Sequence, residues 1–423
     1  MNPLQNINGE LYIDQVSSLK LANRWDTPLY IMSESKIRKQ YRRLHLAFSQ
    51  QYDKTRIFYS AKANTNLSVL KILEQMGSGV DTVSPGEVFL ALKAGFPPRR
   101  IFHSGVSVRD DELEYLLRKE VMINVNSLSQ LQRLLQKGKP HTLSVRVNPE
   151  LGAGHHEHVV TGGKKTKFGN YEVAAGEAYQ IAKDAGVERF GIHMHIGSGV
   201  MEPAPLLQAA QKLLDISLNI HEDTGINFEF VNFGGGIGIP YKPKDKEFDL
   251  EQFSQRLVQL FKEKTSPLGK PEIWLEPGRY MVGEAGVLLT RVTTIKETPF
   301  RRFAGVDAGF NTLIRPAMYG SYHHMLVANR LDDKPTEKYD VVGPLCESGD
   351  VLATDRLLPP LTEGDLLAIL NTGAYGYSMS SHYNSRPRPA EVLVNEGRQD
   401  LIRERETLQD LLRHQKTVER LEK

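Results

Sequence analysis

The chain has 423 residues, 40% hydrophobic and 25% charged, a composition typical of soluble globular proteins and long enough for two or three domains. Its 53 basic and 51 acidic residues leave a formal net charge of +2, which argues against a general nucleic-acid or membrane-surface binder. Roughly 18 consecutive apolar residues would indicate a membrane span, and no run approaches that length. With no secretory signal pattern and a single cysteine, we expect a cytoplasmic protein.

Short β-branched runs alternate with segments of helical periodicity from about residue 57 onward. The intervening segments, such as NLSVLKILEQMG (66–77), place apolar residues at helical spacing. Strands alternating with helices predict parallel βαβ units, and eight of them favour a (β/α)8 TIM-type barrel of about 250 residues. The eight runs are IFYSAKA (57–63), GVDTVS (79–84), RIFHSG (100–105), MINVNS (122–127), HTLSVRVN (141–148), RFGIHMHIG (189–197), FEFVNFGGG (228–236) and EIWLEPGR (272–279).

The pattern changes after Arg279, where strand-like runs follow one another with few helical gaps. This predicts a second, mostly antiparallel β domain, a sandwich or barrel, which the early run ELYIDQV (10–16) is expected to join. The expected domains are therefore a barrel over 28–280 and a β domain over 1–27 plus 281–423. Residues 400–423 carry leucines and a valine at helical spacing and predict a terminal amphipathic helix packed on the body. Those apolar residues are Leu408, Leu411, Leu412 and Val418.

Chemically capable residues stand at the carboxyl ends of the predicted barrel strands. In barrels of this type the active site is built at that end. The alternative is that strand ends simply turn, since turns favour glycine and polar residues. The residues are Lys62, Ser84, Arg146, His195, Gly234, Gly235, Gly236 and Arg279.

Lys62 ends the otherwise apolar first run. Burial lowers the pKa of a lysine, and a neutral amine is the nucleophile that forms a Schiff base with an aldehyde. The alternative is a strand-end lysine whose ammonium reaches solvent.

Three successive glycines, Gly234 to Gly236, end the seventh run. Their unobstructed N–H groups can cradle a phosphate, although a flexible turn remains the alternative. Barrels often bind phosphate near the loops after strands seven and eight, and Glu276-Pro277-Gly278-Arg279 follows the eighth run. This region therefore predicts a phosphate site.

His195 and Glu276 are suited to hold a planar heterocycle. His195 can stack on a ring, although a buried core histidine is the alternative. Ser198, three residues later in the chain, can donate a hydrogen bond to a phosphate. We expect His193 to face the same side at greater depth. A carboxylate at Glu276 can keep a pyridine nitrogen protonated, or can form a salt bridge to Arg279.

Cys346 is the chain's one cysteine, in GPLCESGD (343–350). With Glu347 beside it, the thiol is a candidate proton donor. The alternative is a small buried hydrophobic residue.

Taken in order, the motifs of this chain resemble those of the diaminopimelate decarboxylases, which are enzymes of the alanine-racemase-like fold (fold type III) that depend on pyridoxal 5'-phosphate. The resemblance covers about 28 to 394. The segments that carry it are YSAKAN (59–64), GVDTVSPGE (79–87), RVNP (146–149), KFG (167–169), HMHIGSG (193–199), NFGGGIGIPY (232–241), EPGR (276–279), DAGFNTLIRPAMYGSYHH (307–324), GPLCESGD (343–350) and GAYGYSMSSHYNSRPRP (373–389).

The resemblance implies a role for each matching residue. Lys62 would carry the cofactor, His195 would stack on its ring and Glu276 would pair with its ring nitrogen. Cys346 would supply the final proton. Residues implied around the phosphate are Ser198, Gly234, Gly235, Gly236, Pro277, Gly278 and Arg279; those implied at the substrate are Arg279, Arg315, Tyr319, Glu347 and Tyr375, the last also touching the cofactor.

The implied enzyme is a carboxy-lyase that converts meso-2,6-diaminopimelate to L-lysine and CO2, the last step of lysine biosynthesis. It would act as a homodimer in which Cys346 and Glu347 reach the neighbouring subunit's site, without a metal. The alternative substrates within the same group are ornithine, arginine and carboxynorspermidine. One segment departs from the family pattern: the chain has His103-Ser104-Gly105-Val106 where most relatives show a His-Gly-Asn type segment, which puts a polar cofactor contact there in doubt.

Overall fold

The computed structural model describes residues 3–154, 161–163 and 166–421, and they form two compact units. The barrel domain is 36–284, and the β domain is 1–35 together with 285–423. Strand β4 (Leu29–Ser33), which we expected in the barrel, pairs instead with strands β13 and β19 of the β domain. All five of its residues are buried, and the strand falls inside the expected barrel range only because the boundary between the domains was expected at residue 28.

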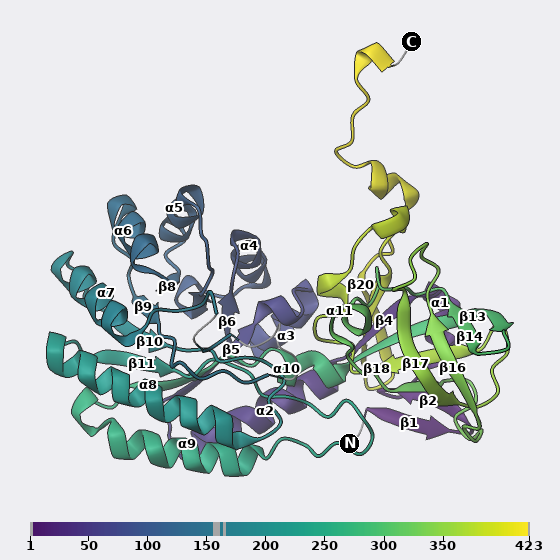
Figure 1. The fold of residues 1–423 in the computed structure, drawn as a ribbon, viewed down its shortest axis with the longest axis horizontal. Coiled ribbons are helices and arrows are strands. Elements are labelled where there is room, and N and C mark those ends of the chain that lie inside the picture. Colours follow the sequence, from purple (N-terminus) through teal and green to yellow (C-terminus); the bar gives the residue numbers. More distant parts are fainter. Residues whose placement is uncertain (1–2, 155–160, 164–165, 422–423) are drawn as a thin grey trace. The chain divides into compact units, whose positions relative to one another are not determined.

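The barrel domain contains the predicted closed barrel of eight parallel strands (Figure 1). Every run expected from the sequence contributes one strand, although each strand is shorter than its run because the last residues form the loops at the carboxyl end. In spatial order the barrel runs β10-β11-β12-β5-β6-β7-β8-β9. The strands are β5 (Thr55–Ser60), β6 (Gly79–Thr82), β7 (Ile101–His103), β8 (Met122–Val125), β9 (Leu143–Arg146), β10 (Phe190–His193), β11 (Phe228–Asn232) and β12 (Glu272–Leu275).

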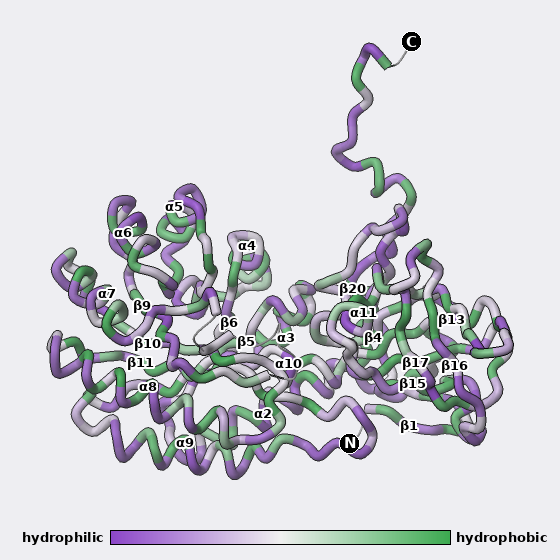
Figure 2. The backbone as a smooth tube through the Cα atoms, viewed as in Figure 1, coloured by the Kyte–Doolittle hydropathy of each residue, from purple (hydrophilic) through white to green (hydrophobic). Residues whose placement is uncertain are grey.

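Helices surround these strands, and in Figure 2 they carry both hydrophobic and hydrophilic segments, as expected of helices with one face on a barrel. Several begin at a side chain that accepts a backbone N–H, among them Asn66, Ser84 and Ser127. Ser84, a candidate site residue, thus caps a helix. The helices are α2 (Glu34–Ser49), α3 (Leu67–Gln75), α4 (Pro85–Ala94), α5 (Asp110–Arg118), α6 (Leu128–Lys137), α7 (Glu172–Asp184), α8 (Pro203–Thr224), α9 (Leu250–Lys264) and α10 (Arg279–Val282).

An aromatic layer fills the middle of the barrel. Phe230 and Trp274 stack with ring centroids 3.5 Å apart, and Phe58 lies 4.2 Å from Trp274. Two glycines make room for these rings: a Cβ at Gly79 would lie 2.5 Å from Phe58, and one at Gly191 would lie 2.0 Å from Phe230. Because alternate strand residues point inward, the inward residues above this layer stand at the carboxyl mouth.

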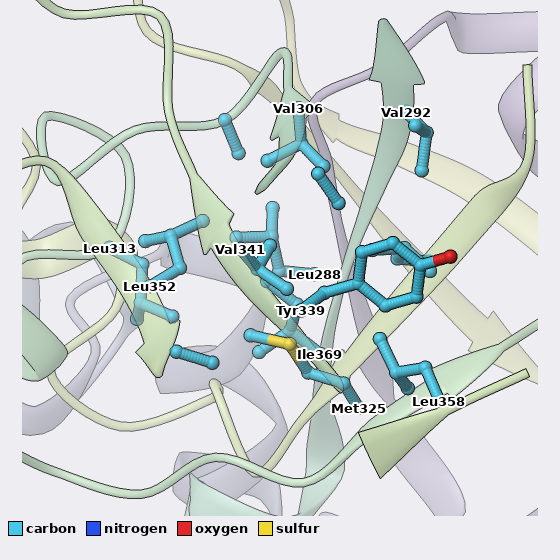
Figure 3. Close-up of a cluster of buried hydrophobic side chains, with 14 of the residues drawn as sticks. Leu288, Val292, Val306, Leu313, Met325, Tyr339, Val341, Leu352, Leu358 and Ile369 are labelled. Atoms are coloured by element: carbon cyan, nitrogen blue, oxygen red, sulfur yellow. The ribbon is translucent and has the colours of Figure 1, made fainter. Parts of the chain in front are cut away.

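The β domain is built on a nine-stranded, mostly antiparallel sheet. Neighbouring residues of β4 enter different cores: Tyr30 belongs to one hydrophobic cluster, other members of which are labelled in Figure 3, whereas Leu29 and Ile31 pack in another. Since strand side chains alternate between faces, the sheet is covered on both sides. Its other strands are β13 (Gly286–Glu297), β14 (Arg302–Val306), β15 (Met325–Val327), β16 (Glu337–Val342), β17 (Val351–Leu358), β18 (Leu366–Leu370), β19 (Ala390–Asn395) and β20 (Arg398–Arg403).

The N-terminal run belongs to the β domain as expected, but it forms a separate three-stranded sheet. Strands β1 (Leu4–Ile7), β2 (Glu10–Ile13) and β3 (Val16–Ser17) precede helix α1 (Ser18–Trp25). Leu11 and Ile13 are buried in the same core as Leu29. No helix in the described part of the chain is long and apolar enough to cross a membrane.

The predicted terminal helix over 400–423 is wrong. Its first residues complete β20, and the described remainder forms only short 3-10 turns at Leu408–Leu412 and Glu419–Leu421, seen at the yellow end of the chain in Figure 1. Leu408 is 71% exposed and Leu412 58% exposed, so the apolar spacing does not produce a packed face. A short amphipathic helix needs a surface to cover before it becomes stable.

Candidate active site

Lys62 lies in a 3-10 turn, η1 (Ala61–Ala63), directly after β5. Its Nζ is 3.3 Å from Oδ2 of Asp81, and the Lys62 side chain is 34% exposed. Asp81 is fully buried and also accepts hydrogen bonds from the hydroxyls of Ser60 (3.0 Å) and Ser104 (2.6 Å). The Lys62 amine therefore lies beside the carboxylate of Asp81, which two serine hydroxyls fix in place, and not in the apolar surroundings that the sequence predicts.

Glu276 follows β12 and is 3% exposed. Its carboxylate accepts from Asn232 Nδ2 at 2.7 Å and lies 3.1 Å from His193 Nε2, while Asn124 contacts the other ring nitrogen of His193 at 3.1 Å. Burial acts to raise the pKa of Glu276, but the charge and hydrogen bond of His193, with help from Lys62 and Asn232, lower it. The result is an ionised carboxylate beneath the mouth, with His193 at the depth we expected.

His195 is held as a neutral ring. Its Nδ1 accepts the backbone N–H of Gly235 at 3.1 Å. Burial, followed by the positive charges of Lys62 and Arg146, lowers the pKa of His195 well below its usual value. Arg146 is itself 6% exposed and donates to the His195 carbonyl at 3.2 Å. An uncharged imidazole offers a flat face on which another ring can stack.

The glycine loop packs tightly against the tips of the neighbouring strands. A Cβ at Gly234, Gly235 or Gly236 would meet a backbone oxygen at 2.3, 2.1 or 2.8 Å, respectively. Gly234 and Gly236 also have φ values of +69° and +112°, which favour glycine. No larger residue fits here without moving the backbone.

Arg279 begins α10 after Pro277 and Gly278, and it is 5% exposed. Its guanidinium donates to the Tyr241 hydroxyl at 2.7 Å and to Ser198 Oγ at 3.2 Å. Glu276 and Arg279 therefore bind different partners, and the alternative of a salt bridge between them is wrong. A guanidinium and a serine hydroxyl beside a glycine loop are donors suited to a phosphate.

In the β domain, Arg315 begins α11 (Arg315–Tyr319) and is 1% exposed. Its Nη1 donates to Nε2 of His323 at 2.8 Å. The other ring nitrogen of His323 donates to the Leu370 carbonyl, also at 2.8 Å, which fixes the tautomer. His323 thus aims a buried guanidinium. Tyr319, at the end of the same helix, is partly exposed.

Cys346 is exposed, which excludes a buried hydrophobic role within this chain. Its backbone N–H donates to Asn384 Oδ1 at 2.8 Å, and the exposed Glu347 follows it. The loop is anchored by Asp350, 3% exposed, which accepts the N–H groups of Leu345 (2.8 Å) and Phe310 (2.6 Å). Because the thiol is exposed and the loop is anchored, a reactant can approach the thiol without a change in the conformation of the loop.

Tyr375 has a φ of +57°, rare for a bulky residue, and its side chain is partly buried. Such strain persists only where surrounding structure enforces it, and it gathers at functional positions.

Known proteins match the chain over nearly its full length. The family model for the pyridoxal-binding domain of pyridoxal-dependent decarboxylases matches residues 34–283. The diaminopimelate decarboxylase of Methanothermobacter thermautotrophicus is 56% identical over 419 residues, covering 98% of both chains. This chain belongs to the diaminopimelate decarboxylase family. The crystal structure of the family member from M. jannaschii in complex with L-lysine is 35% identical, with a TM-score of 0.92 over 99% of both chains.

The residues present fit the family's cofactor, pyridoxal 5'-phosphate, and the chain is a carboxy-lyase of that family. The carboxyl mouth combines an amine at Lys62, a neutral ring at His195 and an ionised carboxylate at Glu276. Arg279 and the glycine loop add the donors that a phosphate needs. The departure at His103-Ser104 does not empty that loop of polar contacts, because Ser104 holds Asp81.

Sequence reasoning missed residues that act through the named ones: Asp81, Ser104, Asn232 and His323. Asp81 had a usable signal, since a carboxylate inside a four-residue buried strand needs a partner. His323 had none, because its contact joins positions eight residues apart through a loop.

Proposed function

We propose that this protein decarboxylates meso-2,6-diaminopimelate to L-lysine with pyridoxal 5'-phosphate, as the last step of lysine biosynthesis. The observation that carries the proposal is the joint placement of Lys62, His195 and the ionised Glu276 at one barrel mouth. Lys62 would bind the cofactor aldehyde, His195 its ring face and Glu276 its ring nitrogen. Ser198, Gly234, Gly235, Gly236, Pro277, Gly278 and Arg279 would surround its phosphate.

Bound there, the cofactor supplies a carbonyl for the substrate amine and a ring that accepts the electrons left when CO2 departs. The chain's residues orient and protonate. Glu276, whose ionised form is favoured, would pair with the ring nitrogen of the cofactor and keep it protonated. Cys346 would give the proton at Sγ to the substrate α-carbon, and Lys62 would be the residue that holds the cofactor between turnovers.

We propose that the far end of the substrate sets specificity. That end of diaminopimelate carries both an ammonium and a carboxylate, and Arg315 with Glu347 offers one partner of each sign. Arg279, Tyr319 and Tyr375 are the other residues proposed to contact the substrate. Ornithine or arginine ends in a cation alone, which leaves a buried guanidinium such as Arg315 without its anion.

The test is CO2 release from meso-diaminopimelate, ornithine, arginine and carboxynorspermidine, measured on the holoenzyme at matched concentrations. We expect turnover of meso-diaminopimelate to exceed that of every other substrate. Preference for another member of the panel would overturn the substrate assignment and leave the cofactor assignment standing.

We further propose a cytoplasmic homodimer with shared active sites, in which Cys346 and Glu347 serve the neighbouring subunit's cofactor. The exposure of Cys346 supports this, because a thiol open to solvent in one chain is available to another. Lys62→Ala and Cys346→Ala should each be inactive alone, yet regain activity when mixed. A mixed dimer has one site with neither substitution, so random exchange predicts roughly a quarter of wild-type activity.

The exchange itself is verified first, with tagged and untagged wild-type chains. If subunits exchange and the mixture of variants stays inactive, Cys346 acts within its own chain and the shared-site proposal is wrong.

A further inference from the structure

A second polar cavity, of about 690 Å³, lies at the opposite end of the barrel from the candidate active site. Its lining comes from residues at the amino ends of the strands: Lys54 precedes β5, Arg189 precedes β10 and Lys270 precedes β12. The amino ends of parallel barrel strands share one mouth, so these segments converge. The cavity's volume lies within the range of about 300–1,000 Å³ that is usual for small-molecule sites.

The floor of this cavity is the aromatic layer of the barrel. Phe230 and Trp274 both line it, and they are 1% and 3% exposed. Their rings stack in parallel, with an interplanar angle of 3°. Because this packed layer lies between the two mouths, a ligand of the amino mouth would enter and leave without passing the cofactor.

Basic side chains outnumber acidic ones around the cavity, five to two. Both carboxylates already have basic partners. Glu272 binds Arg56 at 2.8 Å and accepts the indole N–H of Trp274 at 2.7 Å. Glu229 is gripped by two nitrogens of Arg189, at 2.7 and 2.8 Å. Each carboxylate of the cavity therefore already neutralises one arginine, and neither is left for the remaining basic side chains.

Three cations remain in excess: Lys54, Arg99 and Lys270. None of them makes a salt bridge within the residues that the structure describes. Lys54 Nζ instead donates to the carbonyl of Lys270 at 3.1 Å, which brings the two lysine segments together. All three side chains are exposed, so water screens their mutual repulsion, but like charges at one mouth still do not stabilise the fold by themselves. An anion in the cavity would remove the repulsion.

We propose that this cavity binds a small oxyanion that carries two or more negative charges. Guanidinium and ammonium groups hold both phosphate and carboxylate oxygens, so the shared chemistry is a multivalent oxyanion, from a phosphorylated compound or a polycarboxylate. The proposal is independent of the reaction at the other mouth.

The test is calorimetric titration of the cofactor-loaded holoenzyme with pyrophosphate and with citrate at constant ionic strength, with acetate as a monovalent comparison. Saturable binding of either multivalent anion, and not of acetate, supports the proposal. Tighter binding of pyrophosphate would indicate a phosphorylated compound as the ligand, and tighter binding of citrate would indicate a polycarboxylate. An absence of saturable binding for both overturns it.

The site is located by a matched pair of double variants. Arg99→Gln with Lys270→Gln removes two of the unpaired cations; Arg256→Gln with Lys262→Gln removes the same charge from exposed positions of α9, outside the cavity. Loss of two charge-assisted contacts should weaken binding about tenfold or more in the first, and less than about twofold in the second. Equal affinities in the two would place the anion elsewhere, for example at Arg279, and overturn the proposal.

A single variant tests the charge argument in the opposite direction. Glu229→Gln leaves Arg189 without its carboxylate and makes the cavity more basic. Binding should become tighter by about threefold, the effect of a partly exposed charge. Unchanged or weaker binding would contradict the proposed role of the excess cations.

Discussion

The two domains hold their candidate functional residues by different means. In the barrel, Lys62, His193 and Glu276 stand at or just beyond strand ends and are held by groups from other strands: Lys62 contacts Asp81 of β6, and His193 contacts Glu276 across β11. In the β domain, Arg315 and Cys346 stand on a one-turn helix and a loop, and each is fixed by a second residue nearby. The barrel site is thus a property of the strand register, whereas the β-domain groups depend on a few individual contacts.

The largest expected effect is at the barrel's lysine. Lys62→Ala should abolish the visible absorption band of bound cofactor and nearly all turnover, because it removes the amine proposed to bind the cofactor aldehyde. Lys71→Ala, on the exposed side of α3, is the matched control. Absorption spectra and CO2 release check both variants; a Lys62→Ala enzyme with an unchanged spectrum would remove this lysine from the cofactor site.

In the β domain, Arg315→Lys should not be mild. A guanidinium grips a carboxylate through two parallel hydrogen bonds, and an ammonium cannot. We expect kcat/KM on meso-diaminopimelate to fall roughly 30- to 1000-fold, which corresponds to a loss of about 2–4 kcal/mol of transition-state stabilisation. Arg413→Lys, at an exposed position, is the control. Wild-type kcat/KM in Arg315→Lys would show that the buried guanidinium does not hold substrate.

The stability of the barrel should show a pH dependence to which His103 contributes. Burial lowers its pKa from 6.5 to about 4. The unfolded chain therefore takes up a proton between pH 6.5 and 4 that the folded chain refuses, and stability falls as pH falls through that window. The loss reaches at most about 3.4 kcal/mol, at about 1.36 kcal/mol per pKa unit. Urea unfolding of wild type and His103→Gln isolates it, since their difference should change with pH only there; a constant difference would contradict it.

His323 tests whether the β domain really depends on single positioning contacts. His323→Phe removes the acceptor that aims Arg315 and should lower kcat/KM about tenfold, the value of one charge-assisted bond. His323→Gln can present an oxygen near the Nε2 position and should recover much of the loss. A purely structural role would instead lower stability in both variants and leave kcat/KM of the folded enzyme unchanged.

The smallest effect is expected in the barrel, where contacts overlap. Ser104→Ala removes one hydrogen bond to Asp81 but leaves the bonds from Ser60 and Lys62. We expect a loss of about 1 kcal/mol, or roughly fivefold in kcat/KM. Ser107→Ala, at a nearby loop position, serves for comparison. A loss as large as that of His323→Phe would break the contrast between the two domains.

Sequence patterns predicted the barrel better than the β domain for a physical reason. The βα alternation repeats eight times, so one misplaced boundary does not disturb the rest. Strand β17 pairs with the strand just before it in the chain, but Thr354, Asp355 and Arg356 interrupt its apolar pattern, so periodicity alone does not identify it. Motif matching named Arg315 and Cys346, but the contacts that hold them, through His323 and Asn384, are set by loop geometry that periodicity does not encode.

The glycines beneath the barrel's aromatic layer fix the order in which substitutions can accumulate during evolution. A side chain at Gly191 would overlap the ring of Phe230, and one at Gly79 would overlap Phe58. Each glycine can therefore be replaced only after the ring opposite it has become smaller. That first step opens a cavity in the layer, which costs about 3–5 kcal/mol for a phenylalanine truncated to alanine. Lineages are thus expected to exchange these pairs together or not at all.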